Sequence, residues 1–161
     1  MPVHITEAVF PRDTAALQAV IREYVAWLDM DLSYRGFEQE MARFEQIFTL
    51  PSGLFLLARS EAVIAGCVGL LRHDDRSAEV KRLYVRPGFR GQRLGRRLLE
   101  QLIERARGLG FERLILDAVP QTVVAQGVYE AMGFERTEAY YQAPSPGTKF
   151  YEFKLSAETT P

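Results

Sequence analysis

Four arginines and two glycines gather in the short segment RGQRLGRR at residues 90–97. We expect a helix to begin within it, so the unpaired first N–H groups of that helix and the positive end of its dipole face the segment. Extra cations at such an end are unfavourable unless they hold an anion, and glycine lets backbone N–H groups approach a phosphate closely. The segment therefore indicates phosphate binding. The alternative is a solvated helix face on which the arginines lie near Glu100 and Glu104.

The spacing of the glycines excludes two common phosphate motifs. No Gly-Lys-Ser/Thr follows the segment, as a P-loop requires, and the dinucleotide-binding pattern places its glycines differently. The missing lysine and the lack of a metal-binding acidic motif also argue against a phosphate-loop protein of another class. We therefore expect no metal. The sequence also shows no Ser/His/Asp or Cys/His arrangement for covalent catalysis. Cys67 lies in an apolar run, where burial makes a thiol inert.

Alternating strands and helices must position this segment. Residues 79–85 favour a half-buried strand, and apolar residues recur at helical spacing over 92–107. The apolar run at 112–119 reads as a buried strand, and the intervening helix has the right length for a right-handed crossover between parallel neighbours. Further helices are predicted at 13–28 with Asp13 as N-cap, at 37–48 and at 121–132, and further strands at 3–8, 54–60, 62–73, from 133 onwards and at 150–155.

Length and composition are those of one globular domain, which we expect to span 1–155 with a frayed tail at 156–161. The chain has 161 residues, of which 47% are apolar and 25% charged, and a net charge of −1. This balance argues against a dedicated nucleic-acid binder. No apolar run reaches membrane-spanning length, the N-terminus lacks a signal-peptide pattern, and there is a single cysteine. We therefore expect a cytoplasmic protein with no membrane partner.

Two stretches resemble the GNAT superfamily of N-acetyltransferases, and the likeness extends from about Leu54 to Leu155. The first, RGQRLG at 90–95, is similar to the family's Arg/Gln-x-x-Gly-x-Gly/Ala motif, which binds the pyrophosphate of acetyl-CoA. The second, AQGVYEAMGF at 125–134, is similar to its A-x-x-x-Y-E-x-x-G-F motif. Arg93 replaces the first glycine of the Gly-x-Gly, which removes some backbone freedom and adds a cation.

This resemblance implies an α/β (α+β) fold. The expected architecture is a mixed, twisted sheet of six to seven strands with helices on both faces. The central parallel pair of strands is expected to splay near residues 83–85 and 116–118, so that a cofactor can enter between them.

The resemblance also implies acetyl-CoA as cosubstrate and assigns residues to it. Backbone groups of Leu83, Tyr84 and Val85 are expected to pair with the pantetheine arm like an extra strand. Thr122 stands where the family often has asparagine, three residues before the matched Ala125, and a hydroxyl replaces only part of an amide's hydrogen bonding. Arg97 either meets another phosphate of the coenzyme or faces solvent. The residues expected at the pyrophosphate are Arg90, Gly91, Gln92, Arg93, Leu94, Gly95 and Arg96.

Two catalytic residues follow from the resemblance. Tyr129 occupies the motif tyrosine, which in the family is usually the general acid for the coenzyme A sulfur; the alternative is a core tyrosine packed on Phe134. Glu79 opens the strand that in the family lies between cofactor and acceptor, so it is the candidate base. It could instead be an ion-pair partner of Lys81 or Arg82, which follow at once.

The expected acceptor is a primary amine of a small molecule, an amino acid or a peptide. The resemblance places its pocket between 29–40 and 140–149, where tyrosines and prolines suggest aromatic walls. Candidate substrate-binding residues are Asp31, Tyr34, Glu38, Tyr140 and Tyr141, and the alternative for each is a solvated loop or helix end. A homodimer agrees with the resemblance, although no sequence feature demonstrates one. The alternative function is a non-catalytic acyl-CoA sensor with the same fold.

Overall fold

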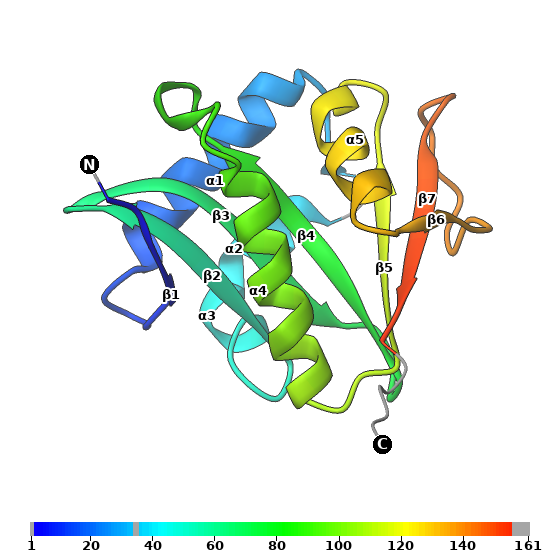
Figure 1. Cartoon of the computed structure of the whole chain (residues 1–161), viewed down its shortest axis with the longest axis horizontal. Helices are drawn as coiled ribbons and strands as arrows, with labels where there is room; N and C mark the ends of the chain where they lie inside the picture. Colours follow the sequence, from blue (N-terminus) through cyan, green and yellow to red (C-terminus); the bar gives the residue numbers. More distant parts are fainter. Residues whose placement is uncertain (1, 34–35, 156–161) are drawn as a thin grey trace.

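A computed structural model describes residues 2–33 and 36–155, and within these residues seven strands form one mixed sheet (Figure 1). The strand order across the sheet is β1-β2-β3-β4-β5-β7-β6, and β4 and β5 are its parallel pair. The strands are β1 (His4–Glu7), β2 (Gly53–Ser60), β3 (Val63–Arg72), β4 (Ser77–Val85), β5 (Arg113–Ala118), β6 (Glu135–Arg136) and β7 (Lys149–Lys154).

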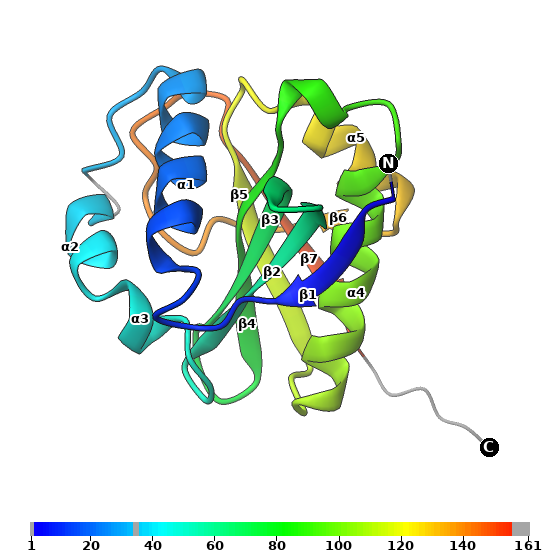
Figure 2. The same ribbon diagram turned by 90° about the vertical axis from the view of Figure 1, so that its left-hand side faces the viewer.

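Helices cover both faces of the sheet, as Figure 2 shows. On one face lie α4 (Leu94–Gly108) and α5 (Val123–Ala131); on the other lie α1 (Thr14–Leu28), α2 (Phe37–Ala42) and α3 (Phe44–Ile47), and a 3-10 turn, η2 (Pro87–Phe89), precedes α4. Successive side chains of a strand point to opposite faces, so Leu54 and Leu56 of β2 pack with α4 while Phe55 and Leu57 pack with α1. Two-sided burial explains why these strands read as continuous apolar runs.

The structure confirms the fold expected from the sequence and corrects some of its details. The crossover through α4 and the parallel β4–β5 pair are as expected. The helix expected at 37–48 instead breaks at Arg43, whose backbone leaves the helical region and separates α2 from α3. The strand expected from residue 133 is the two-residue β6, and the expected tail at 156–161 lies outside the described residues. None of the helices in the described residues is long and apolar enough to cross a membrane.

The two central strands separate soon after they begin. β4 and β5 pair only where Ser77 to Glu79 face Arg113 to Ile115, and beyond this point the ribbons diverge in a V (Figure 1). The splay expected near 83–85 is therefore present, and it begins earlier in the strand. Beyond Glu79, the edge of β4 that faces β5 has no strand partner among the described residues.

Asp13 lies at the start of α1, where we expected its carboxylate to cap the helix. The carboxylate makes no capping hydrogen bond. It accepts hydrogen bonds from the Val9 N–H at 2.7 Å and from Arg12, and it forms an ion pair with Arg59 of β2 at 2.5 Å. Burial alone would raise the pKa of Asp13, but these three donors outweigh it and lower the pKa to about 2. The carboxylate thus ties the chain before α1 to the sheet.

Replacing Asp13 with Asn should lower the free energy of unfolding at pH 7 by about 1–2 kcal/mol. A carboxylate with a lowered folded pKa stabilises the fold above its unfolded pKa, near 3.8, and loses that contribution as the pH falls towards about 2. Urea unfolding at pH 7 and at pH 2.5 should therefore show a difference between wild type and variant that shrinks in acid. Asp75→Asn, at an exposed turn position, is the control. An equal difference at both pH values would contradict the assignment.

Candidate active site

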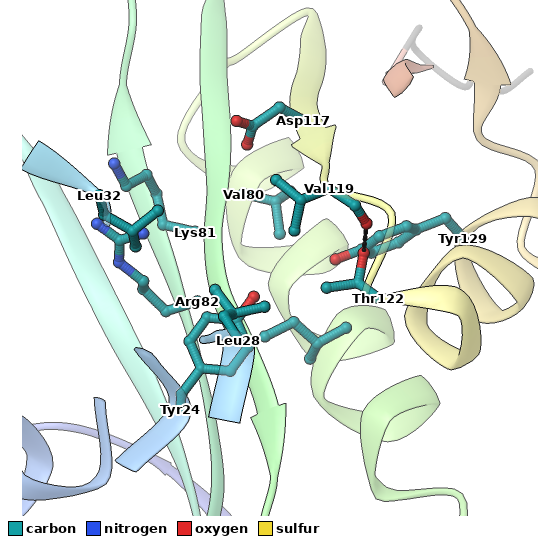
Figure 3. Close-up of a pocket in the computed structure, with 11 residues that line it drawn as sticks. Tyr24, Leu28, Leu32, Val80, Lys81, Arg82, Asp117, Val119, Thr122 and Tyr129 are labelled. Atoms are coloured by element: carbon teal, nitrogen blue, oxygen red, sulfur yellow. Dashed lines mark hydrogen bonds between the residues drawn. The ribbon is translucent and has the colours of Figure 1, made fainter. Parts of the chain in front are cut away.

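A pocket opens between β4 and β5 at the point where the two strands diverge (Figure 3). One wall is β4, and the opposite wall comes from the end of β5 and from α5. Side chains of α1 and the segment after it close one end. The lining residues are Tyr24, Leu28, Leu32, Val80, Lys81, Arg82, Leu83, Asp117, Val119, Thr122 and Tyr129.

A β-bulge in β4 shapes this wall. Three steps of β4, from Lys81 to Tyr84, lie opposite two steps of β3, and Arg82 takes a left-handed backbone conformation with φ 59°. The bulge inverts the alternation of the strand: Val80 before it and Leu83 after it both pack towards α4. It also allows two consecutive cations, Lys81 and Arg82, to reach the same carboxylate.

That carboxylate is Glu40 of α2. Lys81 Nζ lies 3.1 Å from Glu40 Oε1, and the Arg82 guanidinium lies 3.0 Å from the same atom. All three side chains are more than nine-tenths buried, and Arg82 also lies over the Phe37 ring. Buried charges are costly to desolvate, so the three groups depend on one another for compensation. The cluster fixes α2 against the bulged part of β4.

Tyr129 reaches the pocket from α5. Its ring packs on Phe134 and Tyr151, with centroids 5.5 and 5.9 Å away, while its hydroxyl faces the opening (Figure 3). The residue is 7% exposed, and within the described part of the chain its hydroxyl has no hydrogen-bond partner. Burial, together with nearby groups such as Asp117, raises the pKa of Tyr129 far above its usual value. Tyr129 is therefore both a packed core residue and a protonated donor aimed into the pocket.

The turn between β5 and α5 satisfies its own polar groups. Thr122 Oγ1 donates to the Val119 carbonyl at 2.8 Å, and Gln126 Nε2 donates to the same carbonyl at 3.1 Å. Thr122 thus lines the pocket, but its hydroxyl proton is already donated to the Val119 carbonyl of the same turn. The family often has an asparagine at the position of Thr122; in this chain an amide, that of Gln126, lies one helical turn further along.

Two carboxylates on the diverging strands accept hydrogen bonds from consecutive tyrosines. Tyr140 donates to Glu79 Oε2 at 2.6 Å, and Tyr141 donates to Asp117. Glu79 is buried and lies on β4; Asp117 lies on β5 and lines the pocket, with its carboxylate directed towards β4 (Figure 3). The segment between β6 and β7 therefore spans the opening between the strands.

The arginine segment follows η2 and contains a turn, with Gly91 at φ 89°, and the start of α4. Arg90 folds back towards β4, where its Nε donates to the Val85 carbonyl at 2.9 Å and its guanidinium lies 5.9 Å from the Trp27 and Tyr84 rings. Arg93, at φ 59°, precedes the first residue of α4. The loop thus presents the N-terminus of α4 beside the unpaired edge of β4.

Two other arginines of the segment have protein partners. Arg96 pairs with Glu100 one turn later, which agrees with the solvated-face alternative for that residue. Arg97 donates to the Val3 carbonyl at 3.1 Å, so it ties the start of the chain to α4. We expected Arg97 to meet a coenzyme phosphate or to face solvent, and this contact is neither of the two.

Comparison with known proteins identifies the family. Residues 21–134 match the model of the acetyltransferase (GNAT) family. Over 156 residues the chain is 31% identical to an uncharacterised N-acetyltransferase of Schizosaccharomyces pombe, and the match covers 96% of each chain. The chain belongs to the GNAT acetyltransferase family.

Solved structures have the same fold. A GNAT acetyltransferase of Staphylococcus aureus superposes with a TM-score of 0.80 at 22% identity, covering 96% of this chain and 100% of that one. The PaiA N-acetyltransferase of Thermoplasma acidophilum, whose structure contains coenzyme A, gives a TM-score of 0.71 at 21% identity, with 96% and 99% covered. The open mixed sheet with helices on both faces is therefore the GNAT fold.

Within this GNAT domain, the predicted base and the predicted acceptor residues do not all come together. Glu79, Tyr140 and Tyr141 share one side of the opening. Asp31 and Glu38 instead line a separate groove beside α1 and α2, where Asp31 accepts from the Ser33 N–H and Glu38 pairs with Arg22. Tyr34 lies outside the described residues.

Sequence reasoning missed Asp117 in the pocket of the GNAT domain and the Glu40 cluster beside it. Asp117 is the one carboxylate inside the apolar run at 113–118, and this isolated charge is the signal that could have identified it. Glu40 and its two cations gave no comparable signal, because the bulge at Arg82 that brings them together has no glycine to mark it. Cys67, as expected, is buried, and burial raises the pKa of its thiol to about 12.

Glu40→Ala should lower the free energy of unfolding by about 3–5 kcal/mol, because it leaves two buried cations without their carboxylate. Glu38→Ala, two residues away on the same helix, removes an exposed ion pair with Arg22 and should cost less than about 1 kcal/mol. Urea unfolding of the two variants measures the contrast. Equal losses would show that the buried cluster does not fix α2 to β4.

Proposed function

We propose that this protein is an acetyl-CoA-dependent N-acetyltransferase that transfers an acetyl group directly to a primary amine of a small molecule, amino acid or peptide. The observation that carries the proposal is the Tyr129 hydroxyl, which is aimed into the opening between β4 and β5 from an otherwise buried ring and accepts or donates no hydrogen bond within the described residues. A phenol hydroxyl that faces such an opening is available to donate a hydrogen bond to a ligand there.

The proposed place of the cosubstrate follows from two features of the chain. The edge of β4 at Leu83, Tyr84 and Val85 can pair with the pantetheine arm as with an added strand. The segment 90–96 and the N-terminus of α4 offer N–H groups and cations to the pyrophosphate. Arg90 now donates to the Val85 carbonyl, so we propose that it exchanges this contact for a phosphate oxygen when the coenzyme binds. The coenzyme A in the Thermoplasma structure supports the choice of an acetyl-CoA cosubstrate.

Acetyl-CoA supplies the acetyl group as a thioester, so the chain must orient the amine, take up its proton and provide a proton for the sulfur. Tyr129 is the proposed acid. Its raised pKa keeps it protonated at neutral pH, and it also lies far above the pKa of an ordinary thiol, about 8.5. Tyr129 therefore assists as a hydrogen-bond donor to the departing sulfur rather than by complete proton transfer.

Glu79 is the proposed base, acting on the amine proton directly or through water. Its burial on β4 and its hydrogen bond from Tyr140, beside the opening, support this proposal. Of the other acceptor candidates, Tyr140 and Tyr141 lie on the same side of the opening, and Asp31 and Glu38 are proposed only to line its approach.

The proposal is tested first by binding. Titration calorimetry should show acetyl-CoA binding, and Arg90→Ala should weaken coenzyme A at least tenfold while pantetheine, which lacks the nucleotide phosphates, binds as before. Arg76→Ala, at an exposed surface position away from the loop, is the matched control. Equal losses for both ligands would contradict the phosphate role of Arg90. Thiol release with a panel of amines, amino acids and short peptides then tests transfer; binding without release for any of them would favour the sensor alternative.

Tyr129→Phe should lower the turnover number by about a hundredfold, because it removes the donor to the sulfur, and it should leave acetyl-CoA affinity nearly unchanged. Tyr151→Phe is a suitable control, since its hydroxyl lies beside the same ring cluster but donates to Glu130. Steady-state kinetics from pH 6 to 10 measure both variants. Unaltered turnover of Tyr129→Phe across this range would remove the residue from the acid role.

A further inference from the structure

Three aromatic side chains meet beside the arginine segment. Tyr24 and Trp27 are one turn apart on α1, and their rings lie nearly parallel with centroids 6.3 Å apart. Tyr84 of β4 packs against both, at 5.2 Å from the Tyr24 ring and 6.5 Å from the Trp27 ring. Tyr24 lines the pocket (Figure 3), and Tyr84 belongs to the part of β4 that no longer pairs with β5. This aromatic cluster therefore joins the pocket wall to the strand edge proposed for pantetheine.

The Tyr84 ring is fixed within the cluster. The residue is buried, and its hydroxyl donates to Glu23 Oε2 at 2.8 Å. Glu23 in turn pairs with Arg86, whose Nη2 lies 3.0 Å from Glu23 Oε1. Arg86, rather than Arg90, is thus the ion-pair partner of this carboxylate, and the Tyr84 ring cannot turn away without breaking its hydrogen bond.

Trp27 is placed differently from Tyr84. It is 46% exposed, although large aromatic side chains usually bury most of their surface. Its ring and the Tyr84 ring both lie 5.9 Å from the Arg90 guanidinium, which is within the range of a cation–π contact. Tryptophan has the ring face that attracts cations most strongly. The exposed indole therefore forms, together with Tyr84, a platform on which Arg90 rests.

Arg90 keeps most of its hydrogen-bonding capacity. Its Nε donates to the Val85 carbonyl, and in the part of the chain that the structure describes its two terminal amino groups donate to no protein atom. Among the same residues it forms no ion pair with a carboxylate, whereas Arg96 pairs with Glu100. Aromatic faces attract a guanidinium without neutralising it, but a carboxylate would compete with an incoming anion. Arg90 is therefore held in place with its charge still available to a phosphate.

We propose that Trp27 is a positioning residue for the coenzyme. Together with Tyr84 it holds the Arg90 guanidinium at the end of the β4 edge, where the side chain has only to turn from the Val85 carbonyl to the pyrophosphate. A long side chain loses rotamer freedom when it binds, and the platform reduces this loss because the arginine is already ordered. This inference rests on the proposed function, and it makes Trp27 a determinant of selectivity for coenzyme A over thioesters without the nucleotide phosphates.

A double-mutant cycle on the full-length protein tests the coupling between Trp27 and Arg90. Titration calorimetry should show that Trp27→Leu weakens coenzyme A about fivefold, as expected for a cation–π contact at a partly exposed site, and leaves pantetheine binding unchanged. Trp27→Leu added to Arg90→Ala should weaken coenzyme A by less than about twofold more, because the platform then has nothing to hold.

Two results of the cycle would overturn the proposal. One is an equal effect of Trp27→Leu with and without the Arg90 side chain. The other is an equal loss for pantetheine, which would show that Trp27 only supports the strand edge.

Two further variants separate the aromatic ring from its bulk. Trp27→Phe keeps an aromatic face and should bind coenzyme A within about twofold of wild type. Trp27→Phe as weak as Trp27→Leu would contradict a role of the ring face. Leu109→Ala is the matched control, because it removes an exposed apolar side chain at the far end of α4.

The fluorescence of the protein gives a measurement that needs no Trp27 variant. Trp27 is the one tryptophan in the sequence, so tryptophan emission reports its surroundings alone. Coenzyme A should change this emission in the wild type, because Arg90 moves relative to the indole. The change should disappear in Arg90→Ala at a saturating concentration of coenzyme A. No change in the wild type, or a change that persists in Arg90→Ala, would overturn the proposal.

Coenzyme A binding by the wild type distinguishes this inference from the proposed function. A wild type that does not bind coenzyme A would defeat both. A wild type that binds it, with independent effects of Trp27→Leu and Arg90→Ala, would leave the proposed function standing and overturn this inference alone.

Discussion

The structure depends on the early separation of β4 from β5. Parallel strands usually continue to pair, but here the ladder ends after Glu79 and Ile115. A left-handed residue, Arg82, then displaces the rest of β4, at a cost of about 1–2 kcal/mol for a side chain other than glycine. The unpaired strand edge, the pocket beside it and the inverted alternation of side chains all follow from this one departure from regular pairing.

The strain at Arg82 is compensated by the contacts that it makes possible. Because the bulge turns Arg82 to the same side as Lys81, both cations reach Glu40 and draw α2 against the strand. Such a buried cluster adds little stability compared with well-packed apolar residues, but it tolerates few alternative arrangements. It therefore fixes one wall of the pocket, on which the positions of Glu79 and Tyr84 depend.

The opposite wall is held by aromatic packing. Three rings pack together beneath α5, those of Tyr129, Phe134 and Tyr151. Of Tyr129, only the hydroxyl therefore faces the opening. The proposed acid and the proposed base thus come from different parts of the chain: Tyr129 from α5, and Glu79 from β4, where Tyr140 covers it. A transferase that must align two substrates gains most of its rate from such fixed positions.

The sequence by itself determined the family, the order of strands and helices around the parallel pair, and the arginine segment at the start of α4, because these depend on local periodicity and contiguous motifs. It did not determine the break at Arg43, the contact between Arg97 and Val3, or the meeting of Glu40 with Lys81 and Arg82. Nor did it place Asp117 beside Tyr141, 24 residues away along the chain. Only the tertiary structure decided these, because each joins residues whose separation in sequence carries no periodic signal, and because the bulge that reverses side-chain direction in β4 is marked by no glycine or proline.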